Sequence, residues 1–235
     1  LTFDKKKIPL KLFPQVFAPN LTTKILIDAI LDHSKRKKKF FNKAVDLGCG
    51  CGAIGVSLKK LGIIKNKFYM SDISKKAVLN SKYNLKKNKV TGDVRTGSMF
   101  EPWSTHKFDL IINDISAISS DLVKISPWFK KIPCQSGQDG TKLSIDFLKQ
   151  VLKFSMKNAN IAFPVLSLSN EKKITTFAKK KFKNIKLLNS VSWPLPDEML
   201  KHKKKLDALR KKKFINFTKI SGKIICKTSV YLIKI

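Results

Sequence analysis

Short apolar runs alternate with longer, lysine-rich stretches of helical period along most of the 235-residue chain. The apolar runs predict strands at residues 40–47, 67–71, 93–96, 108–113, 160–168, 184–192 and 223–233. The stretches between them predict helices at residues 21–32, 52–61, 75–87, 141–157 and 171–182. Alternating strands and helices are typical of a mostly parallel sheet that is covered on both faces. The predicted fold class is therefore α/β, with a doubly wound sheet.

Two segments lie outside this alternation. Residues 1–20 are basic, and three prolines break any helix there, so we expect an extended N-terminal segment. Residues 194–221 contain a predicted helix whose start is acidic and whose later turns are basic, an order that suits the helix dipole. We expect residues 21–235 to form one domain, with 194–221 as a basic helical insertion.

The formal net charge of +33 is the most unusual bulk property of the chain. Lysine greatly outnumbers arginine, as an AT-rich genome would favour, yet Asp and Glu are also scarce, at 16 against 49 Lys and Arg. We therefore expect a positive field, which either attracts RNA, the ribosome or another acidic partner or belongs to a merely solvated surface. The segment from Lys201 to Lys213 holds eight Lys or Arg residues. It is either an RNA contact or a solvated helix attached by Met199, Leu206 and Leu209.

The apolar runs and the cysteines restrict the location of the protein. No apolar run is long enough to span a bilayer, so we expect a soluble, cytoplasmic protein without a membrane segment. The four cysteines fit a reducing compartment. Their spacing matches no ordinary zinc pattern, so no metal site is predicted.

A strand that ends in Asp46-Leu47 leads directly into Gly48-Cys49-Gly50-Cys51-Gly52 and then into a helix. Glycines allow the tight turn and let a ligand lie against bare backbone at the helix N-terminus. Together with Gly55 the loop also matches the G-x-G-x-x-G pattern, so a nicotinamide enzyme is the alternative. The Asp46 carboxylate favours S-adenosylmethionine (SAM), because it suits an ammonium and a sulfonium and would repel a pyrophosphate. The predicted cofactor residues here are Asp46, Gly48, Cys49, Gly50 and Gly52.

Two later segments complete the predicted cofactor site. Asp72 ends the second predicted strand, where its carboxylate can accept hydrogen bonds from both ribose hydroxyls. Capping of the helix that begins near Lys75 is a compatible role for the same side chain. After the third strand, Ser98 is placed to bond the adenine amine and Met99 to border the ring.

In this order the segments resemble the HemK/PrmC-like methyltransferases, which modify the side-chain amide of glutamine in translation factors and ribosomal proteins. The resemblance covers about residues 17–193 and rests on residues 17–26, the glycine loop, Asp72, residues 97–102 and 108–113, and Gly140. It implies a Rossmann-like sheet of seven strands with the last one antiparallel, and SAM as the cofactor. It also implies that Thr23 belongs to the cofactor site and that the substrate is a ribosomal protein or translation factor.

The chain departs from this family in the catalytic loop. The family's Asn-Pro-Pro-Tyr reads Asn113-Asp114-Ile115-Ser116. In the family pattern, the Asn oxygen and the next backbone carbonyl receive the amide hydrogens while the aromatic ring stacks on the amide. Ser116 cannot stack, so Trp128 and Phe129 either supply the missing ring or pack in the core. We expect Asn113 to position the methyl acceptor and Asp114, if it faces the pocket, to accept a proton.

Three functions remain open on the sequence. The resemblance favours methylation of a protein side chain, and the net charge favours methylation of rRNA or tRNA. The altered loop also fits a non-catalytic SAM- or RNA-binding module. No RRM, KH or OB signature is recognisable in the chain, and this argues against the RNA interpretation.

Overall fold

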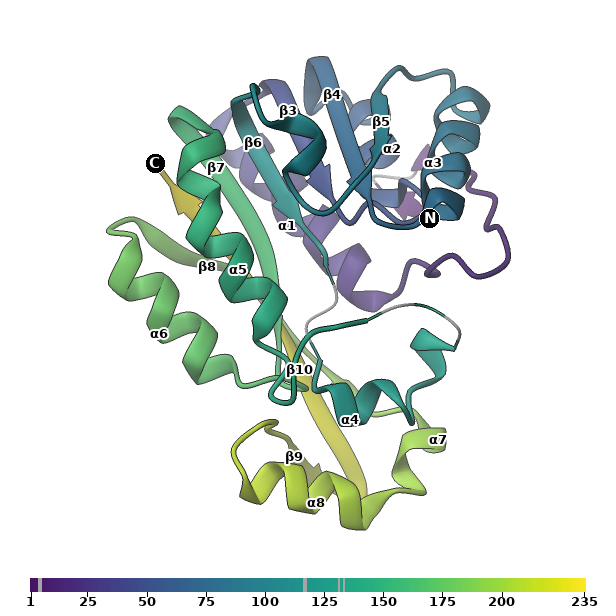
Figure 1. Ribbon diagram of the computed structural model, residues 1–235, viewed down its shortest axis with the longest axis vertical. Coiled ribbons are helices and arrows are strands. Elements are labelled where there is room, and N and C mark those ends of the chain that lie inside the picture. Colours follow the sequence, from purple (N-terminus) through teal and green to yellow (C-terminus); the bar gives the residue numbers. More distant parts are fainter. Residues whose placement is uncertain (4–5, 116–117, 131, 133) are drawn as a thin grey trace.

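The computed structural model describes residues 1–3, 6–115, 118–130, 132 and 134–235. Its main sheet has the strand order β5-β4-β3-β6-β7-β10-β8 (Figure 1). The first five of these strands are parallel to one another, whereas β10 runs antiparallel to both β7 and β8. The expected seven strands with the last one antiparallel are confirmed, and β9 adds a short strand beside β10. The bounds are β3 Phe41–Leu47, β4 Ile64–Asp72, β5 Asp93–Thr96, β6 Phe108–Asn113, β7 Ser155–Leu166, β8 Ile185–Pro194, β9 Thr218–Ile220 and β10 Lys223–Lys234.

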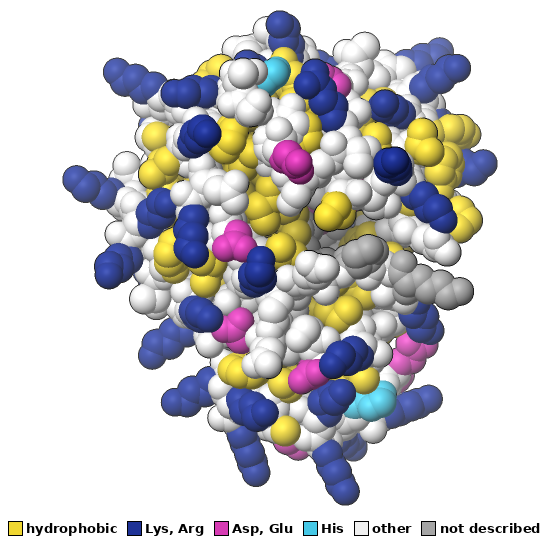
Figure 2. All heavy atoms as spheres, viewed as in Figure 1, with side chains coloured by type: hydrophobic (Ala, Val, Ile, Leu, Met, Phe, Trp, Pro, Cys, Tyr) yellow, Lys and Arg dark blue, Asp and Glu magenta, His cyan; other side chains and the backbone are white. Residues whose placement is uncertain are grey.

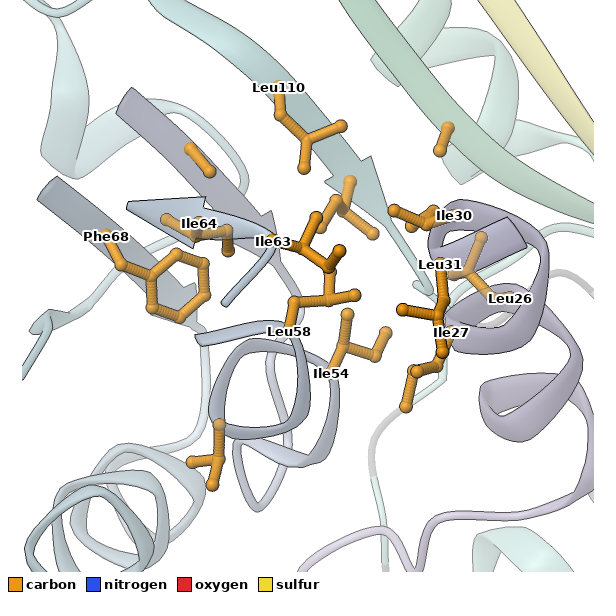
Figure 3. Packing of buried hydrophobic residues seen from close by; sticks show 14 of the residues in the cluster. Leu26, Ile27, Ile30, Leu31, Ile54, Leu58, Ile63, Ile64, Phe68 and Leu110 are labelled. Carbon is orange, nitrogen blue, oxygen red and sulfur yellow. The ribbon is translucent and has the colours of Figure 1, made fainter. Parts of the chain in front are cut away.

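Helices cover both faces of this sheet, as the alternating pattern predicts. On one face α1 (Leu21–Lys37), α2 (Ala53–Lys60) and α3 (Lys75–Lys87) bury apolar side chains against Ala44 and Ile112 of the central strands. Figure 3 shows this packing, with Ile27, Ile30, Ile54, Leu58 and Leu110 among the labelled residues. On the other face α5 (Lys142–Gln150) and α6 (Glu171–Lys181) pack against Val45 and Ile111. Successive residues of a strand point to opposite faces, so the central strands are buried on both sides.

Two predicted helix ends are wrong. The helix expected at 141–157 ends at Gln150, tightens into a 3-10 turn over Val151–Phe154 and gives way to β7 at Ser155. β7 begins there because Ser155 already pairs with Phe108 of β6. The first helix continues to Lys37 instead of ending at 32, because the three cations of its last turn interact favourably with the helix dipole.

Pro164 lies inside β7, although a proline removes a hydrogen-bond donor from a sheet. The parallel ladder between β6 and β7 ends at Ala162. Beyond that residue β7 pairs only with β10, where Pro164 lies opposite Val230. The pairing with β6 therefore loses no hydrogen bond to the proline.

The segment between β8 and β10 forms α7 (Asp197–Leu200), α8 (Lys203–Lys211) and β9 at the lower end of the molecule in Figure 1. Its residues Met199, Leu206 and Leu209 are buried in one apolar cluster with residues of β7 and β10. Seven of its eight Lys and Arg side chains between 201 and 213 are exposed, all except Lys205. No helix in the described part of the chain has the length and apolar character needed to cross a membrane.

Candidate active site

A cavity of about 320 Å³ opens where β3, β4, β5 and β6 end, and the face drawn in Figure 2 is hollowed near its middle. Strand order reverses between β3 and β6, and ligands of doubly wound sheets bind in the crevice at such a point. Eight of the predicted site residues line this cavity: Thr23, Gly48, Cys49, Gly50, Asp72, Ser98, Met99 and Asp114. Asp46, Gly52 and Asn113 lie within two residues of these in the chain but do not line the cavity.

The glycine loop supplies a wall made of backbone. The N–H groups of Gly48 and Cys49 both bond to the Ser71 carbonyl of β4, at 2.8 and 3.0 Å. Gly48 has φ +70°, and a Cβ there would lie 2.6 Å from Cγ1 of Ile115, so a side chain at this position would collide with the loop that follows β6. Cys49 and Cys51 are free thiols, and burial raises the pKa of both. They are therefore neutral at pH 7 and act as small apolar residues.

Asp72 connects this loop to the end of β4. Its Oδ2 accepts the Gly50 N–H at 2.9 Å and its Oδ1 accepts the Ser74 N–H at 2.8 Å. Ser74, not Asp72, caps α3, because its hydroxyl accepts the Ala77 N–H. A carboxylate has about four acceptor positions, so Asp72 retains capacity for two further hydrogen bonds on the cavity side.

Three carboxylates converge on this region without a cationic partner. No ion pair among the described residues includes Asp46, Asp72 or Asp114. Asp46 is fully buried, and neither of its oxygens has a hydrogen-bond partner among the described residues. Burial raises the pKa of Asp46 well above its usual range, and Asp114 and Asp72 raise it further, while the nearby Gly55 N–H offsets only part of this effect. A site that destabilises three carboxylates is suited to a cation.

Asp114 faces the cavity and is held in place by α1. The Thr23 hydroxyl donates to its Oδ2 at 2.8 Å. Burial raises the pKa of Asp114 to about 7, and the Thr23 hydrogen bond only partly opposes this rise. The preceding Asn113 is buried, and its Oδ1 accepts the Ile115 N–H at 3.0 Å. Ser116 lies outside the described residues.

The segment after β5 forms another wall of the cavity. Met99 has φ +46°, and its carbonyl accepts the Ser71 hydroxyl at 2.7 Å. The Ser98 N–H bonds to Oε2 of Glu101 at 2.9 Å, which leaves the exposed Ser98 hydroxyl at the cavity. Ile73 also lines the cavity although it is 68% exposed. The sequence reasoning missed Ile73, whose signal is an apolar residue directly after the acid that ends a strand.

An asparagine row on α3 holds the N-terminal segment against the glycine loop. Asn84 accepts the Lys11 N–H and donates to the carbonyls of Lys11 and Cys51, all at 2.8 to 2.9 Å. Asn80 accepts the Phe13 N–H and Asn88 donates to the Pro9 carbonyl. The described part of this segment contains a short β1–β2 pair (Thr2–Phe3 and Lys6–Lys7) and a turn closed by the hydrogen bond from the Val16 N–H to the Phe13 carbonyl. This arrangement carries Phe17 and Pro19 into the cavity wall.

A second, smaller cavity of about 100 Å³ adjoins the first. The two cavities share Phe17, Asp114 and Ile115. Its other walls are mainly apolar and aromatic: Leu21, Ile118, Trp128, Phe129, Pro164, Leu166 and Trp193, with Asn20 and Thr22 as polar members. Sequence reasoning named Trp128 and Phe129 as either stacking or core residues but missed Trp193.

Comparison with known families supports SAM as the cofactor. Residues 14–114 match the methyltransferase small domain. This range begins in the N-terminal segment, includes the glycine loop and ends at Asp114.

Among curated relatives, the release factor glutamine methyltransferase of Borreliella burgdorferi is 30% identical over 148 residues, which are 61% of this chain and 50% of that protein. The ribosomal RNA small subunit methyltransferase C of Actinobacillus pleuropneumoniae is 35% identical over 85 residues, which are 36% of this chain and 25% of that protein. The matched part of this chain thus spans a quarter to a half of the length of these relatives.

Among solved structures, the T. thermophilus 16S rRNA N2 G1207 methyltransferase, in complex with AdoMet and guanosine, has a TM-score of 0.63 at 12% identity. The alignment covers 100% of this chain and 49% of that one. The ribosomal protein L11 methylase from Lactobacillus delbrueckii has a TM-score of 0.55 at 16% identity, over 96% and 86% of the two chains. At such identities the likeness shows the fold alone. The family match over residues 14–114 and these curated relatives make the chain similar to the HemK/PrmC-like class I SAM-dependent methyltransferases.

Proposed function

We propose that this chain transfers the methyl group of SAM to an RNA or protein of the translation machinery. One observation carries the proposal: in a chain with net charge +33, Asp72 and Asp114 line one cavity, the buried Asp46 lies near both of them, and none of the three is ion-paired within the described residues. SAM brings a sulfonium and an ammonium, so it fits a cavity whose carboxylates lack a cation. A dinucleotide brings a pyrophosphate and does not fit.

The residues present match the separate parts of SAM. The remaining acceptor positions of Asp72 suit the ribose hydroxyls, and Ile73, Ser98 and Met99 suit the adenine. The bare backbone at Gly50 allows close approach of the ligand. When bound, SAM supplies an electrophilic methyl group on its sulfonium. All other tasks fall to the chain: orienting the acceptor, excluding water and accepting a proton.

Asp114 is the proposed proton acceptor. It lies on the wall shared by the two cavities, so an acceptor group in the smaller cavity lies beside its carboxylate. A general base is most effective when its pKa is near the working pH, and the pKa of Asp114 is about 7. The Thr23 hydroxyl occupies Oδ2, and Oδ1 is directed to no partner among the described residues. We assign Thr23 the role of orienting this carboxylate.

Asn113 is proposed to position the loop. The sequence predicted that it contacts the methyl acceptor, but its Oδ1 is engaged by the Ile115 N–H and it lines neither cavity. This hydrogen bond closes a turn that directs Asp114 toward the cavities. Asn113 therefore acts through Asp114 in the ligand-free geometry.

The proposal also concerns which macromolecule, RNA or protein, accepts the methyl group. RNA is favoured by the exposed cations between Lys201 and Lys213, because phosphate neutralisation needs clustered positive charge. A protein acceptor is favoured by the relatives that are named release factor glutamine methyltransferase.

Two measurements test the proposed function. Calorimetry with SAM, S-adenosylhomocysteine and NAD should show binding of the first two and none of NAD. Mass spectrometry should compare rRNA and ribosomal proteins from cells with and without this chain. In the cells without it, one species should be lighter by the mass of one methylene. Binding of NAD in preference to SAM would overturn the cofactor assignment. If SAM binds but neither the rRNA nor the ribosomal proteins carry a methyl group that depends on this chain, the chain is a binding module and not an enzyme.

A further inference from the structure

We propose that the smaller cavity is the methyl-acceptor pocket and that it holds an unpaired nucleobase of RNA against Trp128 and Trp193. The inference rests on the proposed function and deepens it, because it names the acceptor and the residues that select it. In the family, an aromatic ring that stacks on the acceptor follows the asparagine of this loop. In this chain Asn113 is followed by Asp114 and Ile115, and neither carries a ring. The cavity supplies aromatic surface from elsewhere in the fold.

The position of this cavity suits an acceptor. Phe17, Asp114 and Ile115 form the boundary between it and the larger cavity. A planar group that enters the smaller cavity therefore has the Asp114 carboxylate on the side that faces the cofactor site. An exocyclic amine or ring N–H of a base can donate to this carboxylate, which also places the reacting nitrogen toward the larger cavity.

The side chains of Trp128 and Trp193 pack against the fold but remain partly exposed. The rings of Trp128 and Trp193 lie 5.9 Å apart at an angle of 75°, so they form a corner with two faces. The Trp193 Nε1–H donates to the Thr228 hydroxyl at 2.9 Å, which fixes the indole in β8 against β10. Both tryptophans are partly exposed, whereas Trp103, the third in the chain, is fully buried. Partly exposed, rigid aromatic faces in a cavity are suited to stacking on a planar ligand.

Charge selects RNA over a peptide as the source of that planar group. Trp128 and Trp193 pack on the same apolar cluster as Met199, Leu206 and Leu209, so the basic α8 adjoins the aromatic cavity. Lys205 of α8 and Lys212, which follows α8, contribute to lowering the pKa of Asp121 in α4 (Ser120–Val123), after the larger effect of Lys124. Their positive charge therefore lies near the loop that leads to Trp128. The lower end of the molecule in Figure 2 is rich in Lys and Arg. Phosphates on either side of a bound base would meet these cations.

The test uses two short oligoribonucleotides, one unstructured and one fully duplex, with SAM present. Base–aromatic stacking by one residue predicts that Trp128→Leu and Trp193→Leu each weaken binding of the unstructured oligonucleotide about 5- to 150-fold. Trp128→Phe should restore most of the affinity because a ring remains. Phe40→Ala removes an exposed aromatic from the start of β3, remote from the cavity, and is the matched control. The SAM dissociation constant, measured separately, should not change in any of these variants.

Each outcome decides between the alternatives. Weakened RNA binding with unchanged SAM binding and unchanged thermal unfolding supports the pocket. RNA binding that is equal in wild type and both Leu variants, or absent in wild type, overturns it. Methylation of a ribosomal protein and not of RNA overturns the nucleobase acceptor while the proposed methyl transfer stands. Failure of SAM itself to bind is a failure of the proposed function, and calorimetry detects this before RNA is added.

Discussion

The two cavities that meet at Asp114 are built in different ways. The larger one is formed mainly by short loops at the ends of neighbouring parallel strands, and its walls include glycine backbone, the carboxylates of Asp72 and Asp114, and apolar side chains. The smaller one is formed by ring side chains from the N-terminal segment, the turn at Pro127–Phe129, and β8. The first depends on local strand–turn–helix geometry, and the second depends on how distant segments pack. Changes in the first should therefore alter cofactor binding, and changes in the second should alter acceptor binding.

Asp114 lies on the boundary, so its replacement should have the largest effect on turnover. Asp114→Asn removes the proton acceptor, and general-base catalysis contributes about 10²- to 10⁴-fold. We expect kcat to fall within that range in a methyl-transfer assay on the substrate identified by mass spectrometry. Asp114→Pro, which restores the family residue, is the companion variant. Loss of activity in both variants indicates a working carboxylate, whereas activity retained by the Pro variant would make Asp114 a loop residue only.

Asp72 belongs to the larger cavity alone. Asp72→Ala should weaken SAM binding about 10- to 100-fold, because hydrogen bonds to a charged group contribute about 1.5 to 3 kcal/mol. Asp72→Asn keeps one oxygen for the Gly50 N–H and should lose less. Calorimetry measures both variants. If SAM affinity is the same in wild type and the Ala variant, Asp72 only connects the glycine loop to α3.

The basic α8 segment belongs with the smaller cavity. Replacing Lys203, Lys204, Lys211 and Lys212 by Ser should flatten the dependence of log RNA affinity on log salt by about 0.7 to 0.9 for each phosphate that is no longer neutralised. The control removes the same charge elsewhere, from the exposed Lys86, Lys87, Lys179 and Lys180. Equal slopes for the two quadruple variants would show that only net charge matters and that α8 is a solvated face.

The same comparison explains what could be predicted from the sequence. The glycine loop and Asp72 could be placed because strand ends, glycine turns and helix starts are local patterns, and parallel strands bring their carboxyl ends to one edge. Trp193 could not be placed in a site. Its strand alternates like any edge strand, and its approach to Trp128 depends on β8 lying beside β10 at the far end of the sheet.

The errors in the fold have a similar origin. The apolar period of 141–157 continues past Gln150, yet the pairing of Ser155 with Phe108 ends the helix early. A tertiary contact here overrides a local signal. The predicted contact between Asn113 and the methyl acceptor stays a prediction, and the hydrogen bond between Asn113 Oδ1 and the Ile115 N–H forms a local turn.

The raised pKa of Asp114 makes cofactor binding depend on pH. A cation stabilises the carboxylate, so SAM should lower this pKa, release a proton on binding and bind more tightly as pH rises through about 7. Affinity should rise by at most about tenfold per pH unit below 7 and level off above it. Calorimetry at pH 6, 7 and 8 in two buffers of different ionisation heat measures both effects. Asp46 and Asp72 face the same region, so Asp114→Asn is the variant that isolates Asp114, and a pH dependence that persists in it belongs to the other two.

The smallest effect on ligand binding is expected from Asn84, which lines neither cavity but holds the segment that leads to both. Phe17 lines both of them, and the segment before it is attached to α3 by Asn84, which is fully buried and bonds Lys11 and Cys51. Asn84→Ala removes the side-chain partner of the Lys11 N–H and of the Cys51 carbonyl, while the Lys11 carbonyl keeps its hydrogen bond from Asn80, and the loss costs about 1 to 3 kcal/mol of stability. We expect a lower thermal unfolding temperature and only a few-fold weakening of both SAM and RNA binding.

Asn88→Ala is the matched control, because Asn88 caps the C-terminal end of α3, is also buried and holds the segment only at Pro9. Both variants should unfold at lower temperature, but only Asn84→Ala should weaken the two ligands together. That pattern differs from Asp72→Ala, which acts on SAM alone, and from Trp128→Leu, which acts on RNA alone. If Asn84→Ala lowers stability and leaves both affinities unchanged, then the N-terminal segment stabilises the fold without positioning Phe17, and the two cavities are independent of it.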